Sequence, residues 1–230
     1  MMVIAVKTLV TPEQVARALR VAWLRLFDAE VADHQLAVLM AQSALETGRW
    51  KSCWNFNLGN IKGGGAWAGD TCQFRLNEVI GGVVQWFDPP HPQTTMRAYS
   101  TLADGAADYL WLLRRRFARA WDPILRGDPV AFSQTLKSLR YYTAPEEPYT
   151  KAVKSLTATY ARLLATLGPE APAPVEAVPT PVEEEDGPFD HLALSIAARH
   201  AVDEVRQEAM AEMRDLDTEP PEPPPDTERA

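Results

Sequence analysis

The stretch Gln-Ser-Ala-Leu-Glu-Thr-Gly at residues 42–48 places one carboxylate, Glu46, in the last turn of a strongly apolar helix. Residues 36–41, Leu-Ala-Val-Leu-Met-Ala, are apolar on every face, which is typical of a helix buried inside a domain. Apolar surroundings disfavour the charged form of a carboxyl, so its pKa rises and it can act as a general acid near neutral pH. This indicates glycosidic-bond chemistry. The alternative is a solvated glutamate just before a helix-ending glycine, Gly48.

The segment that follows is rich in aromatic residues and glycine. It is too aromatic for a simple loop and too glycine-rich for a helix. A carbohydrate site combines aromatic plates, which cover the apolar faces of sugar rings, with amide side chains that bind hydroxyl groups. We therefore expect this segment to line a groove, although core packing of some tryptophans is the alternative. The expected substrate-binding residues are Trp50, Trp54, Asn57, Asn60 and Trp67.

A series of motifs in order resembles the peptidoglycan-cleaving N-acetylglucosaminidases of glycoside hydrolase family 73, which include the muramidase domain of flagellar rod assembly proteins. The resemblance spans roughly residues 11–168 and departs from the family pattern where Gly59 precedes Asn60 and where Met96 replaces a phenylalanine. The matching segments are Glu46-Thr47-Gly48, Asn57 to Lys62, Glu78 before Gly82, Met96 to Ser100, Asp108-Tyr109, and Tyr142 to Pro145 with Tyr149.

The resemblance implies a lysozyme-like fold, α+β and mostly α, with a groove between a helical body and a small β-hairpin lobe. It implies an endo-β-N-acetylglucosaminidase that cuts peptidoglycan glycan strands, with Glu46 as general acid and Glu78 as a base that activates water. Tyr99 would orient the N-acetyl group or stabilise positive charge on the sugar, and Tyr142 would line the groove. An exposed Glu78 and a core Tyr99 are the alternatives.

Three other outcomes stay open for this site. Within the enzyme class, a muramidase cuts the other backbone bond, and a lytic transglycosylase needs only one acid/base carboxyl and forms an anhydro product without water. Outside it, a non-catalytic cell-wall-binding or assembly module of a phage-like particle would keep the groove without the chemistry.

Charge divides the chain into two parts. Residues 1–168 carry 19 basic and 14 acidic residues and all seven tryptophans, whereas residues 169–230 carry 4 basic and 17 acidic residues. We expect one domain over 1–168, an extended Pro/Glu-rich linker over 169–188, an amphipathic helix over 189–216 and a disordered tail over 217–230. The amphipathic helix has no core of its own, so it either docks on the domain, self-associates or binds a protein partner.

Periodicity predicts the elements of the domain. Helices are expected to begin at Thr11-Pro12, after Thr101 with continuation to Trp121, at Asp128-Pro129, and at Pro148 with an end at Leu167. Two short strands are expected on either side of Gly81-Gly82.

Other chemistry has little support in the sequence. The four histidines lack metal-ligand spacing, and no phosphate-binding loop is present, so we expect no metal and no cofactor. Cys53 and Cys72 could form a disulfide or remain reduced and buried. Arg114 to Arg116 indicates a solvated helix face rather than a nucleic-acid site.

The sequence does not show the export features expected of an enzyme that acts on the cell wall. Residues 1–10 lack the features of a secretory signal, and no stretch is long enough to span a membrane. The substrate would nevertheless lie in the periplasm or outside the cell. We therefore expect a virion-associated enzyme or a phage lysis protein.

Overall fold

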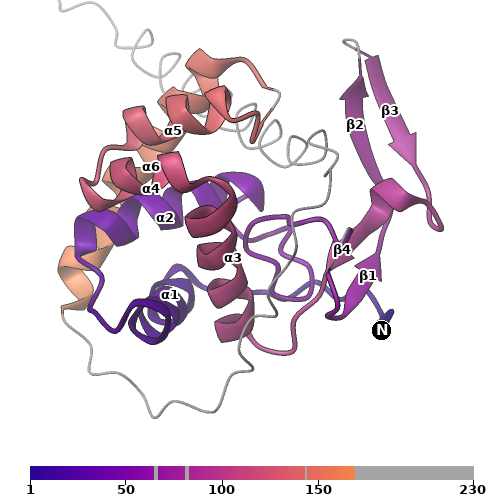
Figure 1. Ribbon diagram of the computed structural model, residues 1–230, viewed down its shortest axis with the longest axis horizontal. Coiled ribbons are helices and arrows are strands. Elements are labelled where there is room, and N and C mark those ends of the chain that lie inside the picture. Colours follow the sequence, from indigo (N-terminus) through magenta and orange to yellow (C-terminus); the bar gives the residue numbers. More distant parts are fainter. Residues whose placement is uncertain (65–66, 81–82, 143, 169–230) are drawn as a thin grey trace, which may run out of the picture.

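The computed structural model describes residues 1–64, 67–80, 83–142 and 144–168. This part has the mostly α, lysozyme-like arrangement that the sequence indicated, with a helical body and a small β lobe (Figure 1). The helices are α1 (Pro12–Phe27), α2 (Asp33–Glu46), α3 (Leu102–Arg116), α4 (Ala118–Leu125), α5 (Pro129–Ser138) and α6 (Glu146–Leu167), with a 3-10 turn, η1 (Pro92–Thr94). The strands are β1 (Thr71–Gln73), β2 (Leu76–Ile80), β3 (Val83–Phe87) and β4 (Thr95–Arg97).

The predictions for 169–188, 189–216 and 217–230 fall outside the described residues. The linker, the amphipathic helix and the tail therefore stay predictions.

Helix α2 is the centre of the helical body. Every residue from Leu36 to Glu46 is buried, as the pattern of apolar residues on all faces predicted. Helix α6 packs along α2, and α1 packs against α3 (Figure 1). Because residues 36–46 of α2 are surrounded by protein on all sides, a polar side chain among them must find its partners inside the fold.

The helix boundaries follow the capping residues. Thr11 and Gln14 form a capping box at the start of α1, and Thr101 and Asp128 cap α3 and α5, which confirms the three predicted starts. Helix α2 stops before Gly48, whose φ of 56° belongs to the left-handed region. Helix α6 begins slightly before the predicted proline, since the first turn of a helix tolerates proline.

The predicted continuous helix from Thr101 to Trp121 is wrong. Phe117 leaves the helical conformation, with φ −113° and ψ 39°, and separates α3 from α4. The break directs Phe117 against Tyr141, with ring centroids 4.8 Å apart, and stacks Trp121 on Trp23 at 5.0 Å. The aromatic contacts of Phe117 and Trp121 stabilise the break between α3 and α4 relative to one continuous helix.

The β lobe consists of two antiparallel ribbons. Strands β2 and β3 form the predicted hairpin, with Leu76 opposite Phe87. Strands β1 and β4 form a second ribbon that the sequence did not predict, with Cys72 opposite Met96. Each strand of this second ribbon is three residues long, too short to show an alternating apolar pattern.

Both cysteines are free and buried. Cys53 belongs to the main core, whereas Cys72 belongs to a small cluster under the β lobe. Burial raises the pKa of each thiol to about 11, which disfavours the nucleophilic thiolate. Of the two alternatives drawn from the sequence, the structure has the reduced one. None of the described helices is both long and apolar enough to cross a membrane.

The contact between α3 and the loop before the β lobe can be tested at Gly105. A Cβ atom at this position would overlap the backbone carbonyl oxygen of Phe56. Gly→Ala inside a helix normally stabilises by about 1 kcal/mol. We predict instead that Gly105→Ala lowers the free energy of unfolding by roughly 1–3 kcal/mol, because backbone must move to admit the methyl group. Urea denaturation measures the change.

Gly64→Ala is the matched control. A Cβ atom there has nothing within 4 Å, so its free energy of unfolding should match that of the wild type within error. Equal stability of the two variants would contradict the close approach of α3 to Phe56.

Candidate active site

The candidate site is centred on the carboxyl group of Glu46, at the end of α2. The side chain has no exposed surface. Its Oε1 atom accepts hydrogen bonds from Gln42 Nε2 at 3.1 Å and from the Tyr149 hydroxyl at 3.0 Å. Its Oε2 atom is buried without a hydrogen-bond partner. The two oxygens of one carboxyl group therefore have different surroundings.

Burial dominates the protonation of Glu46. Desolvation raises the pKa from the ordinary glutamate value of 4.5 to about 8, and the hydrogen bonds from Tyr149 and Gln42 oppose this rise. Both donors are neutral, so neither contributes a positive charge that would stabilise the carboxylate. The group is therefore protonated at neutral pH, as the apolar pattern of α2 predicted.

A second layer of polar groups holds the two donors. Gln42 Nε2 also donates to the Tyr141 hydroxyl at 2.9 Å, and Gln42 Oε1 accepts from the Tyr109 hydroxyl at 2.5 Å. Burial and the nearby Glu46 raise the pKa of both tyrosines well above the ordinary value, so they stay neutral donors and acceptors. Gln42, Tyr109 and Tyr149 were not among the predicted site residues. The available signal for Gln42 was its spacing of one helical turn from Glu46.

Tyr142, expected to line the groove, lies beside the site but is buried. Its ring stacks on Tyr149 with centroids 3.6 Å apart and an interplanar angle of 10°. Its hydroxyl lies 3.3 Å from Ser133 Oγ, which in turn lies 2.7 Å from Thr150 Oγ1. Tyr142 therefore supports the tyrosine that binds Glu46, and in this structure its face is covered.

The two asparagines have backbone partners. Asn57 is 2% exposed, and its amide group binds the backbone of Ile61 and Arg97. The expectation that Asn57 binds sugar is therefore wrong, because its donor and acceptor atoms hold the loop together. Asn60 has φ 50° and donates to the carbonyl oxygen of Glu46 at 2.6 Å, so it satisfies an unpaired carbonyl at the end of α2. Of the two, Asn60 adjoins the candidate acid.

The three expected sugar-binding tryptophans are not brought together. Trp50 is 2% exposed, donates from Nε1 to Ser43 Oγ and packs near Tyr160, so its assignment to a groove wall is wrong. Trp54 is half-buried and stacks on Phe74 of the β lobe at 4.6 Å. The core alternative thus holds for Trp50.

Trp67 and Tyr99 belong to a second polar cluster. Trp67 is half-buried, lies 4.3 Å from the Arg97 guanidinium and makes an edge contact with Tyr99. Arg97 forms a buried ion pair with Asp108 at 3.1 Å, and the Tyr99 hydroxyl donates to Asp108 at 2.5 Å. The hydroxyl of Tyr99 thus connects the segment after β4 to α3. The assignment of Tyr99 as a catalytic residue stays a prediction.

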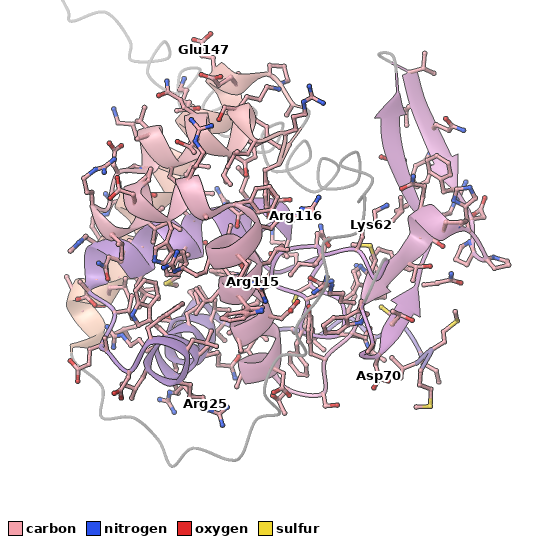
Figure 2. All side chains as sticks on the ribbon, in the orientation of Figure 1. Arg25, Lys62, Asp70, Arg115, Arg116 and Glu147 are labelled. Carbon is pink, nitrogen blue, oxygen red and sulfur yellow. The ribbon has the colours of Figure 1, made fainter. Side chains whose placement is uncertain are left out.

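Glu78, the expected base, lies in β2 opposite Gln85. Its side chain is outside the described residues, so its role as second carboxylate stays a prediction. The basic residues of α3, Arg114, Arg115 and Arg116, lie in its last turn. Lys62 lies next to β4 (Figure 2). Among the described residues, no group of three or more histidine, cysteine, aspartate or glutamate side chains is placed to hold a metal ion.

Two solved structures are similar to this chain. One is a peptidoglycan hydrolase mutant from Sphingomonas sp. A1, with 25% identity and a TM-score of 0.47, covering 66% of this chain and 90% of that one. The other is a C-terminally truncated glycoside hydrolase domain from Salmonella typhimurium FlgJ, with 20% identity and a TM-score of 0.44, covering 63% of this chain and 93% of that one. No protein-family model matches the chain, and no curated protein matches it. The chemistry of this chain therefore rests on its own residues.

The raised pKa of Glu46 predicts a pH-dependent cost to stability. The folded protein keeps the Glu46 proton up to pH about 8, whereas an unfolded glutamate releases it near pH 4.5. The unfolded state is therefore increasingly favoured as the pH rises between these values. Glu46→Gln removes this ionisable group. Between pH 5 and pH 9, the free energy of unfolding of the variant should therefore rise relative to that of the wild type by a few kcal/mol, in order of magnitude. Urea denaturation at both pH values measures the gain.

Glu147→Gln is the matched control for this measurement. Glu147 is exposed on α6, so the free energy of unfolding of the Glu147→Gln variant should run parallel to that of the wild type (Figure 2). A Glu46→Gln curve parallel to the wild type would mean that Glu46 is ionised in the folded protein at neutral pH.

Proposed function

We propose that this chain is a peptidoglycan hydrolase that cleaves the glycan backbone as an endo-β-N-acetylglucosaminidase, with Glu46 as general acid. The observation that supports this most directly is a single buried carboxyl whose pKa is about 8 and whose donors all converge on one oxygen. A general acid is most effective when its pKa lies near the working pH. An ordinary surface glutamate would have lost its proton under these conditions.

The proposed reaction begins with proton transfer from Glu46 to the glycosidic oxygen. The bond between this oxygen and the anomeric carbon breaks, and the leaving sugar departs with the proton as a free hydroxyl group. Water then attacks the anomeric carbon and gives up a proton to a base, for which Glu78 is the candidate. Gln42 and Tyr149 remain hydrogen-bonded to Oε1 and stabilise the carboxylate that forms on Glu46.

The neutral surroundings of Glu46 also fit a lytic transglycosylase. The hydrogen-bond partners of its carboxyl are an amide and a phenol, and a transglycosylase needs no second carboxylate. In that reaction a hydroxyl group of the substrate replaces water and an anhydro sugar forms. Loss of activity in Glu78→Gln would support the hydrolase, whereas full activity with an anhydro product would support the transglycosylase.

One observation favours a second function, a non-catalytic cell-wall-binding or assembly module. Glu46 is completely enclosed, so a sugar reaches its carboxyl only after a neighbouring group moves. In a binding module no such movement would be needed, and the buried acid would be a structural residue.

The proposal extends to the place of action. A glycan-cleaving enzyme acts on the cell wall, and we assign residues 189–216 to attachment, through a protein partner or self-association. We also propose that the chain associates with a phage-like particle.

Glycan cleavage is tested with the full-length chain on isolated peptidoglycan sacculi of several wall types. Reduction of the products followed by mass spectrometry identifies the new ends. We predict reduced N-acetylglucosamine ends, and a loss of about 10²–10⁴-fold in rate for Glu46→Gln, because the amide cannot donate the transferred proton. Reduced N-acetylmuramic acid ends would indicate a muramidase, and anhydro ends a transglycosylase.

Glu147→Gln again serves as the control and should cleave at the wild-type rate. If the wild type cleaves none of the sacculi yet sediments with them, the binding module is correct and the catalytic role of Glu46 is wrong.

A further inference from the structure

Gln42 is the most connected polar side chain around the candidate acid. It lies one helical turn before Glu46 on α2 and has no exposed surface. Its amide nitrogen donates to Glu46 Oε1 and to the Tyr141 hydroxyl, and its carbonyl oxygen accepts from Tyr109. In this orientation the amide nitrogen faces Glu46 Oε1 and the amide oxygen faces the Tyr109 hydroxyl.

The orientation of Gln42 decides where the proton of Glu46 resides. Oε1 accepts two hydrogen bonds, from Gln42 at 3.1 Å and from Tyr149 at 3.0 Å. A carboxyl oxygen with two donors directed at it is the carbonyl oxygen of the neutral acid, because a proton on it would clash with those donors. In the neutral acid the proton is therefore on Oε2, the oxygen that has no partner.

We propose that Gln42 is a positioning residue that fixes the transferable proton on Oε2 of Glu46. This inference rests on the proposed function for its catalytic meaning, whereas the placement of the proton is argued from the two hydrogen bonds that Oε1 accepts. Gln42 does not touch the reacting atoms. It acts through Glu46, and Tyr109 and Tyr141 keep it in place.

The groups that face Glu46 come from four parts of the helical body. Gln42 lies on α2 itself, Tyr109 lies on α3, and Tyr149 lies on α6, with Tyr141 in the connection between α5 and α6. The three tyrosines all have pKa values raised well above the ordinary range by burial, and the charge of ionised Glu46 raises them further. They remain neutral while Glu46 titrates, so a change in the titration of Glu46 reports on its hydrogen bonds.

Gln42→Met tests the proposal, because methionine has a similar length and no donor. The amide of Gln42 stabilises the carboxylate form of Glu46, so its removal should raise the pH of half-titration by about one pH unit. We predict that the upper limb of the pH profile of kcat/KM moves up by this amount. We also predict that kcat at the optimum falls at least tenfold, because the proton is no longer confined to Oε2.

A second readout does not require activity. The carbonyl stretch of a protonated carboxyl, taken from infrared difference spectra between the wild type and Glu46→Gln, gives the titration midpoint directly. The same midpoint in the Gln42→Met background, measured against Gln42→Met with Glu46→Gln, should be higher by the same amount. If the wild type cleaves no glycan but the midpoint moves, the proposed function fails, whereas the hydrogen bond from Gln42 to Glu46 is supported.

Two further variants complete the experiment. Ser43→Ala is the control, since Ser43 is equally buried on α2 and binds Leu58 and Trp50; it should lower the melting temperature without moving the midpoint. Gln42→Asn withdraws the amide from Glu46 by one carbon atom and replaces Gln42→Met if the latter does not fold. A folded Gln42 variant with the wild-type midpoint and the wild-type upper limb would overturn the proposal.

Discussion

The structure depends on the burial of one carboxyl group at the end of a helix that is surrounded by protein. Transfer of an ionised carboxylate into an apolar interior is so unfavourable that the group takes up a proton instead. In this chain the proton is retained up to pH about 8, even though two donors favour its loss. The apolar residues of α2 thus provide both the centre of the core and the raised pKa of its final residue.

The polar groups around Glu46 show how the fold accommodates this burial. Donors come from the preceding turn of α2 and from α6, and the groups that hold Gln42 come from α3 and the connection before α6. Each is a neutral amide or phenol. A lysine or arginine in the same place would form an ion pair and lower the pKa of Glu46. Neutral donors orient the carboxyl without removing its proton.

The sequence predicted those features that depend on local residue patterns. The apolar residues of α2 predicted its burial and that of Glu46, and the capping residues predicted the starts of three helices. Features that depend on distant contacts were missed or misassigned. Phe117 breaks a helix because its ring packs on Tyr141, and Trp50 is a core residue because Ser43 binds its indole nitrogen. A tryptophan in a core and a tryptophan in a binding site have the same sequence signal, so only the fold separates them.

The enclosure of Glu46 limits how a substrate could meet it. If the acid gave up its proton, the carboxylate left behind would need the donors on Oε1, because an unpaired buried charge is very unfavourable. A movement that displaced Gln42 or Tyr149 would therefore remove a hydrogen bond that stabilises the carboxylate formed when Glu46 gives up its proton. The opening that preserves the chemistry uncovers Oε2 alone and leaves both donors on Oε1. The asymmetry of the carboxyl, with two partners on one oxygen and none on the other, permits such an opening without the loss of a single hydrogen bond to Glu46.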